Sequence, residues 1–354
     1  MYKLLIVNPG STSTKIAVYE DENPIFERAV RHSAEELSTF ETIALQYEFR
    51  LAAVVGALKD AGIDLSQLDA IIARGGMMRS VPSGIYEVND AMYFDLSIGF
   101  QGQHASNLGG LIARRMGDEL GIKAYIADPV VVDEMEEIAK VTGVPELRRS
   151  SLFHALNQKA VARRAAADLG RCYEECRFIV AHLGGGISVG AHKDGRVIDV
   201  NNALMGDGPF SPERAGTVPS GPLINLCYQG FDKREIERKF QGNAGMAAYL
   251  GTSSAEEVIK RIDEGDVRAE FIYRAMAYNI AKEIGAMSTV LEGRVDRIII
   301  TGGLAYETRI VRMISDRVGS IAAITVIPGE EEISTLAERG LALLRGEAEL
   351  GTYG

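Results

Sequence analysis

The sequence predicts a two-domain α/β protein that arose by duplication. A strand, a polar turn with glycine and a second strand occur at residues 4–18, and the same plan returns at residues 178–192. In each copy an acidic or glycine turn and another short apolar run follow. The chain has 354 residues, which is more than one compact domain usually holds. We therefore expect one α/β domain in each half of the chain.

The first hairpin predicts a phosphate-binding loop. Its apolar runs at residues 4–7 and 16–18 are rich in β-branched residues and are bounded by turn residues, as buried strands are. Glycine lets the backbone approach an anion, and hydroxyl and amide groups can bind the anion's oxygens. The candidate ligands are Asn8, Ser11, Ser13 and Lys15. The alternative is an ordinary polar turn, because asparagine, proline, glycine and serine are common turn residues.

Two further glycine turns follow apolar strands. In the second hairpin the turn is Gly184, Gly185 and Gly186, and a third strand over residues 297–303 ends in Gly302 and Gly303. Because the same strand-and-turn pattern occurs three times, we interpret it as phosphate-binding chemistry rather than as loop composition alone.

Composition excludes several classes of protein. The net charge of −11 and the absence of a long Lys/Arg block argue against a nucleic-acid partner. No apolar stretch is long enough to span a membrane, and the N-terminus enters a strand directly, so the predicted location is the cytoplasm. The three cysteines are too few for a disulfide framework, and we expect thiols without a metal.

The remaining elements follow from hydrophobic periodicity and turn residues. We predict helices at 38–61, 107–120, 156–169, 267–291 and 333–350, and strands at 68–73 and 123–127. The loop over residues 201–222 is too long for a spacer and is rich in glycine and proline, which indicates a rigid structure around Arg214. No linker separates the halves, so their boundary is expected to be a hinge.

Two arginines and two acids are candidate site residues. Arg74 and Arg214 lie in stiffened loops, and a fixed guanidinium binds carboxylate or phosphoryl oxygens well. Asp128 ends a predicted parallel strand, where functional crevices open, and with Glu331 it is a candidate to organise Mg²⁺. For Asp128 the alternative is a turn-forming residue before proline. Glu330 and Glu332 compete with Glu331 for its assignment.

The five histidines divide into two groups. His104 and His154 sit at predicted helix starts, and His182 lies in the second hairpin, where it could donate to a transferring phosphoryl group. The alternative for each is a structural histidine. His32 and His192 have polar neighbours in the sequence, and we expect them at the surface.

Two motifs resemble one family. Residues 7–15 resemble the amino-terminal motif of acetate and butyrate kinases, which belong to the actin, sugar-kinase and Hsp70 superfamily. Residues 205–219 resemble the second motif of this acetokinase family in its butyrate-kinase form, and the likeness covers essentially the whole chain. It implies two duplicated actin-like ATPase domains with ribonuclease H-like mixed sheets and a nucleotide cleft between them. The first would be residues 1–153 plus a C-terminal helix at 334–354, and the second, nucleotide-binding domain residues 154–333.

The resemblance also implies roles for individual residues. The phosphoryl site would be lined by Asn8, Ser11, Ser13 and Lys15. The phosphoryl group in flight would be bound by His154, His182 and Arg214, the acyl carboxylate by Arg74, and Mg²⁺ by Asp128 and Glu331. ATP or ADP would be held by Gly184, Gly185, Gly186, Gly302 and Gly303.

The implied reaction is reversible phosphoryl transfer from ATP to a short-chain carboxylate, which gives an acyl phosphate and ADP. The expected acid is butyrate or isobutyrate, and a homo-oligomer is expected. Two departures from acetate kinases favour the butyrate branch: Arg74 replaces the histidine of a His-Gly-Gly triplet, and Gly185 replaces an asparagine. The alternatives are an acetate or propionate kinase, and a non-enzymatic, nucleotide-gated protein like actin or a chaperone.

Overall fold

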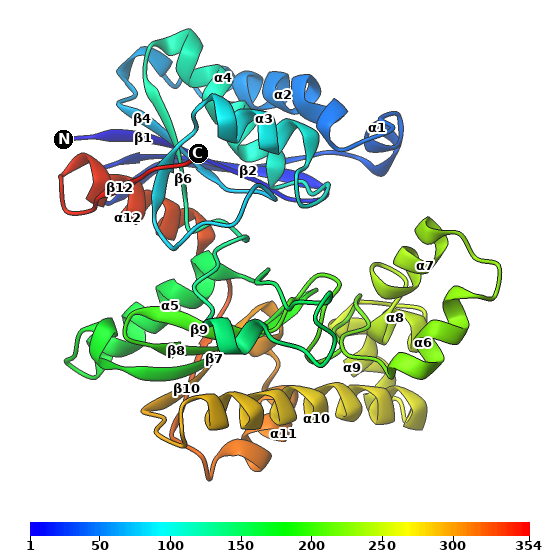
Figure 1. Ribbon diagram of the computed structural model, residues 1–354. Coiled ribbons are helices and arrows are strands. Elements are labelled where there is room, and N and C mark those ends of the chain that lie inside the picture. Colours follow the sequence, from blue (N-terminus) through cyan, green and yellow to red (C-terminus); the bar gives the residue numbers. More distant parts are fainter. The chain divides into compact units, whose positions relative to one another are not determined.

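The computed structural model describes residues 1–354 and forms two compact units (Figure 1). The first comprises Met1–Val132 and Glu331–Gly354, and the second Asp133–Glu330. The expected change of domain after residue 153 therefore lies further along the chain than the observed one. The intervening segment bonds to the second unit, where Glu134 pairs with Lys159 at 2.9 Å and Arg149 pairs with Asp199 at 2.9 Å.

The first unit is built on a seven-stranded mixed sheet. Its spatial order is β12-β5-β6-β4-β1-β2-β3. The strands are β1 (Lys3–Pro9), β2 (Ser13–Glu20), β3 (Asn23–Arg31), β4 (Ala70–Arg74), β5 (Ile85–Glu87), β6 (Lys123–Ala127) and β12 (Leu350–Gly351). β1, β2 and β3 are antiparallel neighbours, whereas β4 runs parallel to both β1 and β6.

The second unit repeats this topology in a five-stranded sheet. Its order is β11-β10-β7-β8-β9, with β7 (Arg177–Leu183), β8 (Ile187–Lys193), β9 (Arg196–Val200), β10 (Arg297–Gly302) and β11 (Ile324–Pro328). β7, β8 and β9 are antiparallel, and β10 runs parallel to β7 and β11. Both sheets thus contain an antiparallel triplet followed by two parallel strands, which confirms the predicted duplication, and the first sheet adds β5 and β12 beyond β6.

Helices cover both faces of the first sheet. They are α1 (Ala34–Ser38), α2 (Tyr47–Asp60), α3 (Asp90–Ile98), α4 (Asn107–Leu120) and α12 (Glu332–Leu344). α4 packs on β1, β4 and β6, and α12 packs on the opposite face of the same strands (Figure 1). The C-terminal segment therefore completes the first unit.

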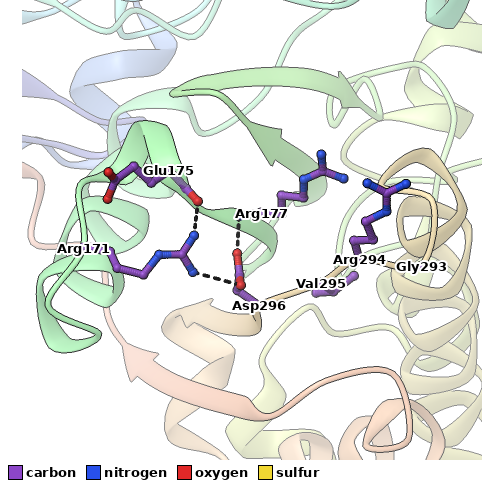
Figure 2. A pocket seen from close by; sticks show the side chains of 7 residues that line it. All are labelled: Arg171, Glu175, Arg177, Gly293, Arg294, Val295 and Asp296. Atoms are coloured by element: carbon purple, nitrogen blue, oxygen red, sulfur yellow. Dashed lines mark hydrogen bonds and ion pairs between the residues drawn. The ribbon is translucent and has the colours of Figure 1, made fainter.

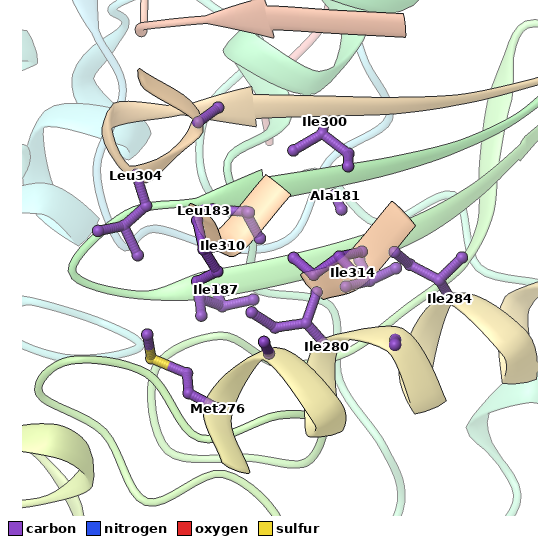
Figure 3. Close-up of a cluster of buried hydrophobic side chains, with 14 of the residues drawn as sticks. Ala181, Leu183, Ile187, Met276, Ile280, Ile284, Ile300, Leu304, Ile310 and Ile314 are labelled. Carbon is purple, nitrogen blue, oxygen red and sulfur yellow. The ribbon is translucent and has the colours of Figure 1, made fainter. Parts of the chain in front are cut away.

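The second unit has its helices on both faces as well. They are α5 (Ala155–Asp168), α6 (Ser220–Cys227), α7 (Lys233–Phe240), α8 (Gly245–Leu250), α9 (Ala255–Asp263), α10 (Val267–Val290) and α11 (Thr308–Val318). α5 packs on β7 and β10, and α10 packs on β7, β8 and α11. Figure 3 shows side chains of the resulting core, among them Ile280 and Ile284 of α10, Ala181 and Leu183 of β7 and Ile300 of β10. Burial of such side chains is the main stabilising term of a fold of this kind.

Short 3₁₀ helices complete the chain at Ala44–Gln46, Leu65–Gln67, Glu137–Lys140, Tyr173–Glu175 and Gly303–Tyr306. None of the helices, including the 24-residue α10, combines the length and the apolar character that crossing a membrane requires.

Two predicted helices are wrong in their extent. The helix expected at 38–61 is shorter than predicted. α1 already ends at Ser38, a bend and a 3₁₀ turn follow, and only α2, from Tyr47 to Asp60, fills the rest of the predicted range. The β-branched Thr39, Thr42 and Ile43 favour this break because they are poor helix formers. The helix expected at 333–350 ends at Leu344, and Gly346 then adopts φ +74°, which a helix cannot continue.

Candidate functional site

A buried arginine organises the first glycine loop. Arg50 lies on the apolar stripe of α2 and is 1% exposed. Its guanidinium donates to Gly10 O at 2.7 Å, Ser11 O at 2.9 Å and Ser13 O at 3.3 Å. Burial lowers the pKa of Arg50, and its remaining partners, Gln46 and Thr14, are neutral. The charge beneath this loop is therefore not neutralised by a hydrogen-bonded carboxylate.

The same contacts orient the loop amides. In a planar trans peptide the C=O and the following N–H point in opposite directions. Because the Gly10 and Ser11 carbonyls face Arg50, the amides of Ser11 and Thr12 face away from it. Both residues are exposed, and neither amide donates to an acceptor in the protein. Two free amides above a buried cation form a cradle for an anion.

Asn8 and Arg74 share one carboxylate. Asn8 Nδ2 donates to Glu332 Oε2 at 2.7 Å, and Arg74 Nη1 lies 3.1 Å from the same oxygen. Glu332 begins α12, so the last helix brings this carboxylate to the ends of β1 and β4. The structure thus brings two of the predicted site residues, Asn8 and Arg74, to one carboxylate, and it adds Glu332 to them.

The other loop candidates differ in exposure. Ser11 and Lys15 are exposed, and Ser13 is half-buried. Lys15 is the register partner of Asn8 on the adjacent antiparallel strand, so their side chains share one face of the sheet. Lys15 therefore lies on the strand that leaves the loop, on the same face of the sheet as Asn8.

His154 and His182 are stacked in the second unit. Their ring centroids are 3.7 Å apart and their planes differ by 9°. His154 precedes α5 and its Nδ1 lies 2.8 Å from Ser188 Oγ. His182, near the end of β7, has Nδ1 2.7 Å from Asn157 Oδ1 and Nε2 3.2 Å from Glu330 Oε1. His182 Nδ1 must carry a proton, because an amide oxygen can only accept.

Arg214 packs against the second glycine loop. Its Nη1 donates to Ala203 O at 2.5 Å, and burial lowers the pKa of Arg214. A Cβ at Gly186 would lie 2.0 Å from that nitrogen, so only glycine permits this approach. Ser211 Oγ donates to Gly185 O at 2.6 Å and joins the long loop to the glycine turn. The long loop is therefore an ordered support for Arg214.

The third glycine turn closes the same edge of the second sheet. Gly302 ends β10 and exchanges backbone hydrogen bonds with Gly329, at 3.1 and 3.0 Å. Gly303 follows, is exposed, and has open space where a side chain would be. The backbone at Gly303 is thus accessible to a ligand. Gly184 and His182 lie nearby, at the end of the parallel neighbour β7.

The predicted metal ligands fit a magnesium ion poorly. Asp128 is 2% exposed; its Oδ1 accepts from Ser83 Oγ at 2.6 Å and from Gly84 N at 2.9 Å, and its Oδ2 lies 3.5 Å from Arg339 Nε. Glu331 caps the start of α12 with its carbonyl. No group of three or more acidic, histidine or cysteine side chains is arranged to hold a metal. The predicted role of Asp128 and Glu331 in binding Mg²⁺ stays a prediction.

The prediction that His32 and His192 lie at the surface is wrong. They are 4% and 0% exposed. His32 Nε2 lies 3.0 Å from Thr14 Oγ1, and burial, followed by the charge of Arg50, lowers the pKa of His32. His192 contacts Tyr173 and Gln158, and burial, followed by Lys159 and Arg163, holds its pKa well below the usual range. Polar neighbours in sequence mislead here, because His32 is covered by Phe49 and Thr14 just after β3 ends and His192 lies on β8, which is buried on both faces.

Two pockets are present, and neither is lined by the glycine turns or by the two stacked histidines. One of about 500 Å³ is lined by Arg171, Arg177, Arg294 and Asp296 at the starts of β7 and β10 (Figure 2). Arg171 is bound to Asp296 at 2.9 Å, as Figure 2 shows, so part of its charge is compensated. His182 lies five residues after the start of the same strand, about 17 Å away. A second pocket of about 370 Å³ lies against Met205, Thr217 and Phe240.

Sequence reasoning missed Arg50 and Glu332. Arg50 had a detectable signal, since it stands three residues after Tyr47 and one before Leu51 and therefore falls on the apolar stripe of the helix. A charged residue at such a position is buried only with dedicated partners. Glu332 had no separate signal within a run of three glutamates.

Known proteins provide an independent comparison. The sequence profile of the acetokinase family matches residues 140–332. Butyrate kinase 1 of Clostridium acetobutylicum is 51% identical over 354 residues, which cover 100% of both chains. A probable butyrate kinase of Clostridium botulinum is 52% identical over 353 residues, 99% of each chain. The crystal structure of Porphyromonas gingivalis acetate kinase has a TM-score of 0.79 at 20% identity and covers 97% of this chain and 100% of its own; it is similar in fold.

Proposed function

Because the chain belongs to the acetokinase family, we propose that it is a butyrate kinase, which transfers the γ-phosphoryl group of ATP to butyrate and runs reversibly. A carboxylate oxygen attacks the γ-phosphorus while the bond from phosphorus to the bridging oxygen of ADP breaks. The products are butyryl phosphate and ADP, and the electron pair of the broken bond stays on ADP.

The observation that carries the proposal is the cluster of His154, His182 and Arg214 around the second glycine turn. It contains fixed donors, as a site that stabilises a transferring phosphoryl group requires. No general base is needed, since a carboxylate is already ionised at neutral pH. Donors of this kind must be preorganised, and here Ala203 holds Arg214 while Ser188 and Asn157 hold the histidines.

The first unit supplies a second set of donors. We assign the amides of Ser11 and Thr12, together with Lys15, to phosphoryl oxygens. Arg74 is our candidate for the substrate carboxylate. Glu332 neutralises Arg74 in the structure, and a bound acid would share the guanidinium with it. The nucleotide would use the glycine backbone at Gly184–Gly186 and Gly302–Gly303. The expected homo-oligomer stays a prediction.

The test is a comparison of acids at matched ATP and Mg²⁺. Each well-buried methylene contributes about 1–3 kcal/mol of discrimination, and two methylenes separate acetate from butyrate. We expect kcat/KM for butyrate or isobutyrate to exceed that for acetate by at least about tenfold, a margin of about 1.4 kcal/mol. Initial rates of ADP release give this ratio, with propionate as the intermediate acid.

Trapping the acyl phosphate with hydroxylamine separates the alternatives. A nucleotide-gated protein like actin or a chaperone would give no hydroxamate from any acid. If the enzyme used acetate as well as the four-carbon acids, the assignment as a carboxylate kinase would stand, but the assignment of butyrate as its substrate would be wrong.

A further inference from the structure

A chain of buried polar groups leads from Tyr173 to His154. Its members are Tyr173, His192, Gln158 and Ser188, contributed by the segment before β7, by β8 and by α5. The last three are 0% exposed, and Tyr173 is 5% exposed. Consecutive contacts measure 2.7, 3.0, 2.8 and 2.8 Å, from Tyr173 to His192, to Gln158, to Ser188 and to His154. The proposed reaction gives no role to any of these four groups.

The direction of every hydrogen bond follows from one carbonyl. Ser188 O can only accept, and it lies 3.1 Å from Gln158 Nε2, which fixes the orientation of the amide. Gln158 Oε1 therefore faces His192 Nε2, so that nitrogen carries the proton. Since burial keeps His192 neutral, its Nδ1 is an acceptor and the Tyr173 hydroxyl donates to it.

The same reasoning reaches His154 on the other side. Gln158 Nε2 also donates to Ser188 Oγ, which leaves the serine with its own proton to place. The one other hydrogen-bond neighbour of that hydroxyl is His154 Nδ1. A buried hydroxyl proton without an acceptor would cost about 1–3 kcal/mol. Ser188 therefore donates to His154 Nδ1, and the neutral imidazole must carry its proton on Nε2.

We propose that Gln158 and Ser188 are positioning residues that lock His154 in the Nε2–H tautomer, so that it presents a fixed donor to the transferring phosphoryl group. The role of that donor rests on the proposed function, whereas the tautomer does not. The stacking of His154 on His182, with ring centroids 3.7 Å apart, holds the imidazole plane of His154 in place beside this chain.

Gly190 shows how closely the fold is built around this chain. A Cβ at position 190 would lie 2.7 Å from Gln158 Oε1 and 3.3 Å from His192 Nε2. A methyl group there would occupy the space of their hydrogen bond. The absence of a side chain on β8 is thus required for the link between Gln158 and His192.

The test is the tautomer of His154 by ¹⁵N NMR of the imidazole in the full-length protein at neutral pH. We expect a protonated Nε2 and an unprotonated Nδ1, and in Ser188→Ala a mixture of the two tautomers. The matched control is Tyr173→Phe, which removes a buried hydroxyl from the same chain but leaves the proton of Ser188 in place. It should keep the tautomer of His154.

Kinetics supply the second readout. We expect Ser188→Ala to lower kcat about tenfold to a hundredfold with little change in KM for ATP, because His154 would no longer be held as a fixed donor to the transition state. Ser188→Thr, which keeps the hydroxyl, should retain the tautomer and most of the rate. A protonated Nδ1 in the unmodified protein, or an unchanged tautomer in Ser188→Ala, would overturn the proposal. Inactivity with every acid would instead overturn the proposed function.

Discussion

At the scale of single residues, the site depends on side chains that are held by neutral groups. Arg50 is held by carbonyls, Arg214 by Ala203 O, and His154 by a serine hydroxyl. Neutral partners fix the geometry of a donor without cancelling its charge. An ion pair to a carboxylate would reduce the positive potential that an anionic phosphoryl group needs. Arg74 differs, because Glu332 neutralises it.

The first prediction concerns Arg214. Arg214→Ala should lower kcat about a hundredfold or more, which is the scale for the loss of one preorganised transition-state donor. Arg214→Lys should recover little, since a lysine cannot both bind Ala203 O and present a planar fork. Steady-state kinetics with butyrate and ATP measure both variants. Arg312→Ala, on the exposed face of α11, is the control, and a rate for Arg214→Ala within about threefold of that control would contradict the assignment.

At the scale of elements, the sequence predicted the parts whose signal is local. The paired hairpins, α4 at 107–120, β6 at 123–127 and the order of the 201–222 loop agree with the structure. Strong apolar periodicity and glycine turns carry that information within short windows. The helices α6–α9 were not predicted, because they are only six to nine residues long and α6 and α7 bury no side chain that would give an apolar periodicity.

The site was predictable to a similar extent. Candidates that lie in glycine motifs were found from sequence, as Gly186 and Arg214 illustrate. Contacts that depend on strand register or on the packing of a helix on a sheet were not found from the sequence. His192 lies on β8, whose two faces are both buried, and Gln158 contacts it only after α5 has packed on the sheet. Such side-chain contacts follow from tertiary packing and not from the local sequence pattern.

The second prediction concerns the loop at Gly10–Ser13. Arg50→Lys keeps the charge but cannot reach the carbonyls of Gly10, Ser11 and Ser13 together. Hydrogen bonds to a charged group contribute about 1.5–3 kcal/mol each, so the loop amides should lose their fixed orientation. We expect KM for ATP to rise about tenfold and kcat to fall by a similar factor.

The measurement is a KM and kcat pair, together with the melting temperature. Arg31→Lys, at an exposed position of β3, is the matched control and should leave both constants unchanged. If Arg50→Lys lost stability but kept both kinetic constants, Arg50 would be a structural residue with no influence on the amide cradle.

At the scale of the whole molecule, duplication explains why the chain carries two unlike donor sets. In each sheet the second strand of the first parallel pair ends next to glycines: β4 ends at Arg74 before Gly75 and Gly76, and β10 ends at Gly302 before Gly303. The first copy kept hydroxyls and a lysine in its hairpin, and the second has three glycines. The copies share a topology, and their differences lie in the loops, where function is carried.

The last prediction concerns the stability of the whole protein as a function of pH. Burial, followed by the charge of Asp207, raises the pKa of Glu283 on α10 to about 7, from an ordinary value of 4.5. Arg149 opposes this shift but is engaged with Asp199 and Asp207, at 2.9 and 2.6 Å. Between pH 4.5 and 7 the Glu283 carboxyl is therefore protonated in a larger fraction of folded molecules than of unfolded ones. Since stability falls with rising pH wherever the folded state holds more protons, Glu283 destabilises the fold progressively across this window.

Glu283→Gln removes that cost because an amide does not ionise. We expect the variant to gain stability relative to the unmodified protein as pH rises from 5 to 8, by up to about 3 kcal/mol, which corresponds to a rise in melting temperature of several degrees. Thermal unfolding at pH 5, 6, 7 and 8 measures the difference. Glu270→Gln, an exposed position of the same helix, is the control and should give a difference that does not change with pH. A Glu283→Gln difference that stayed flat, or that grew towards low pH, would show that Glu283 is ionised in the folded protein throughout and that its surroundings are more polar than its burial indicates.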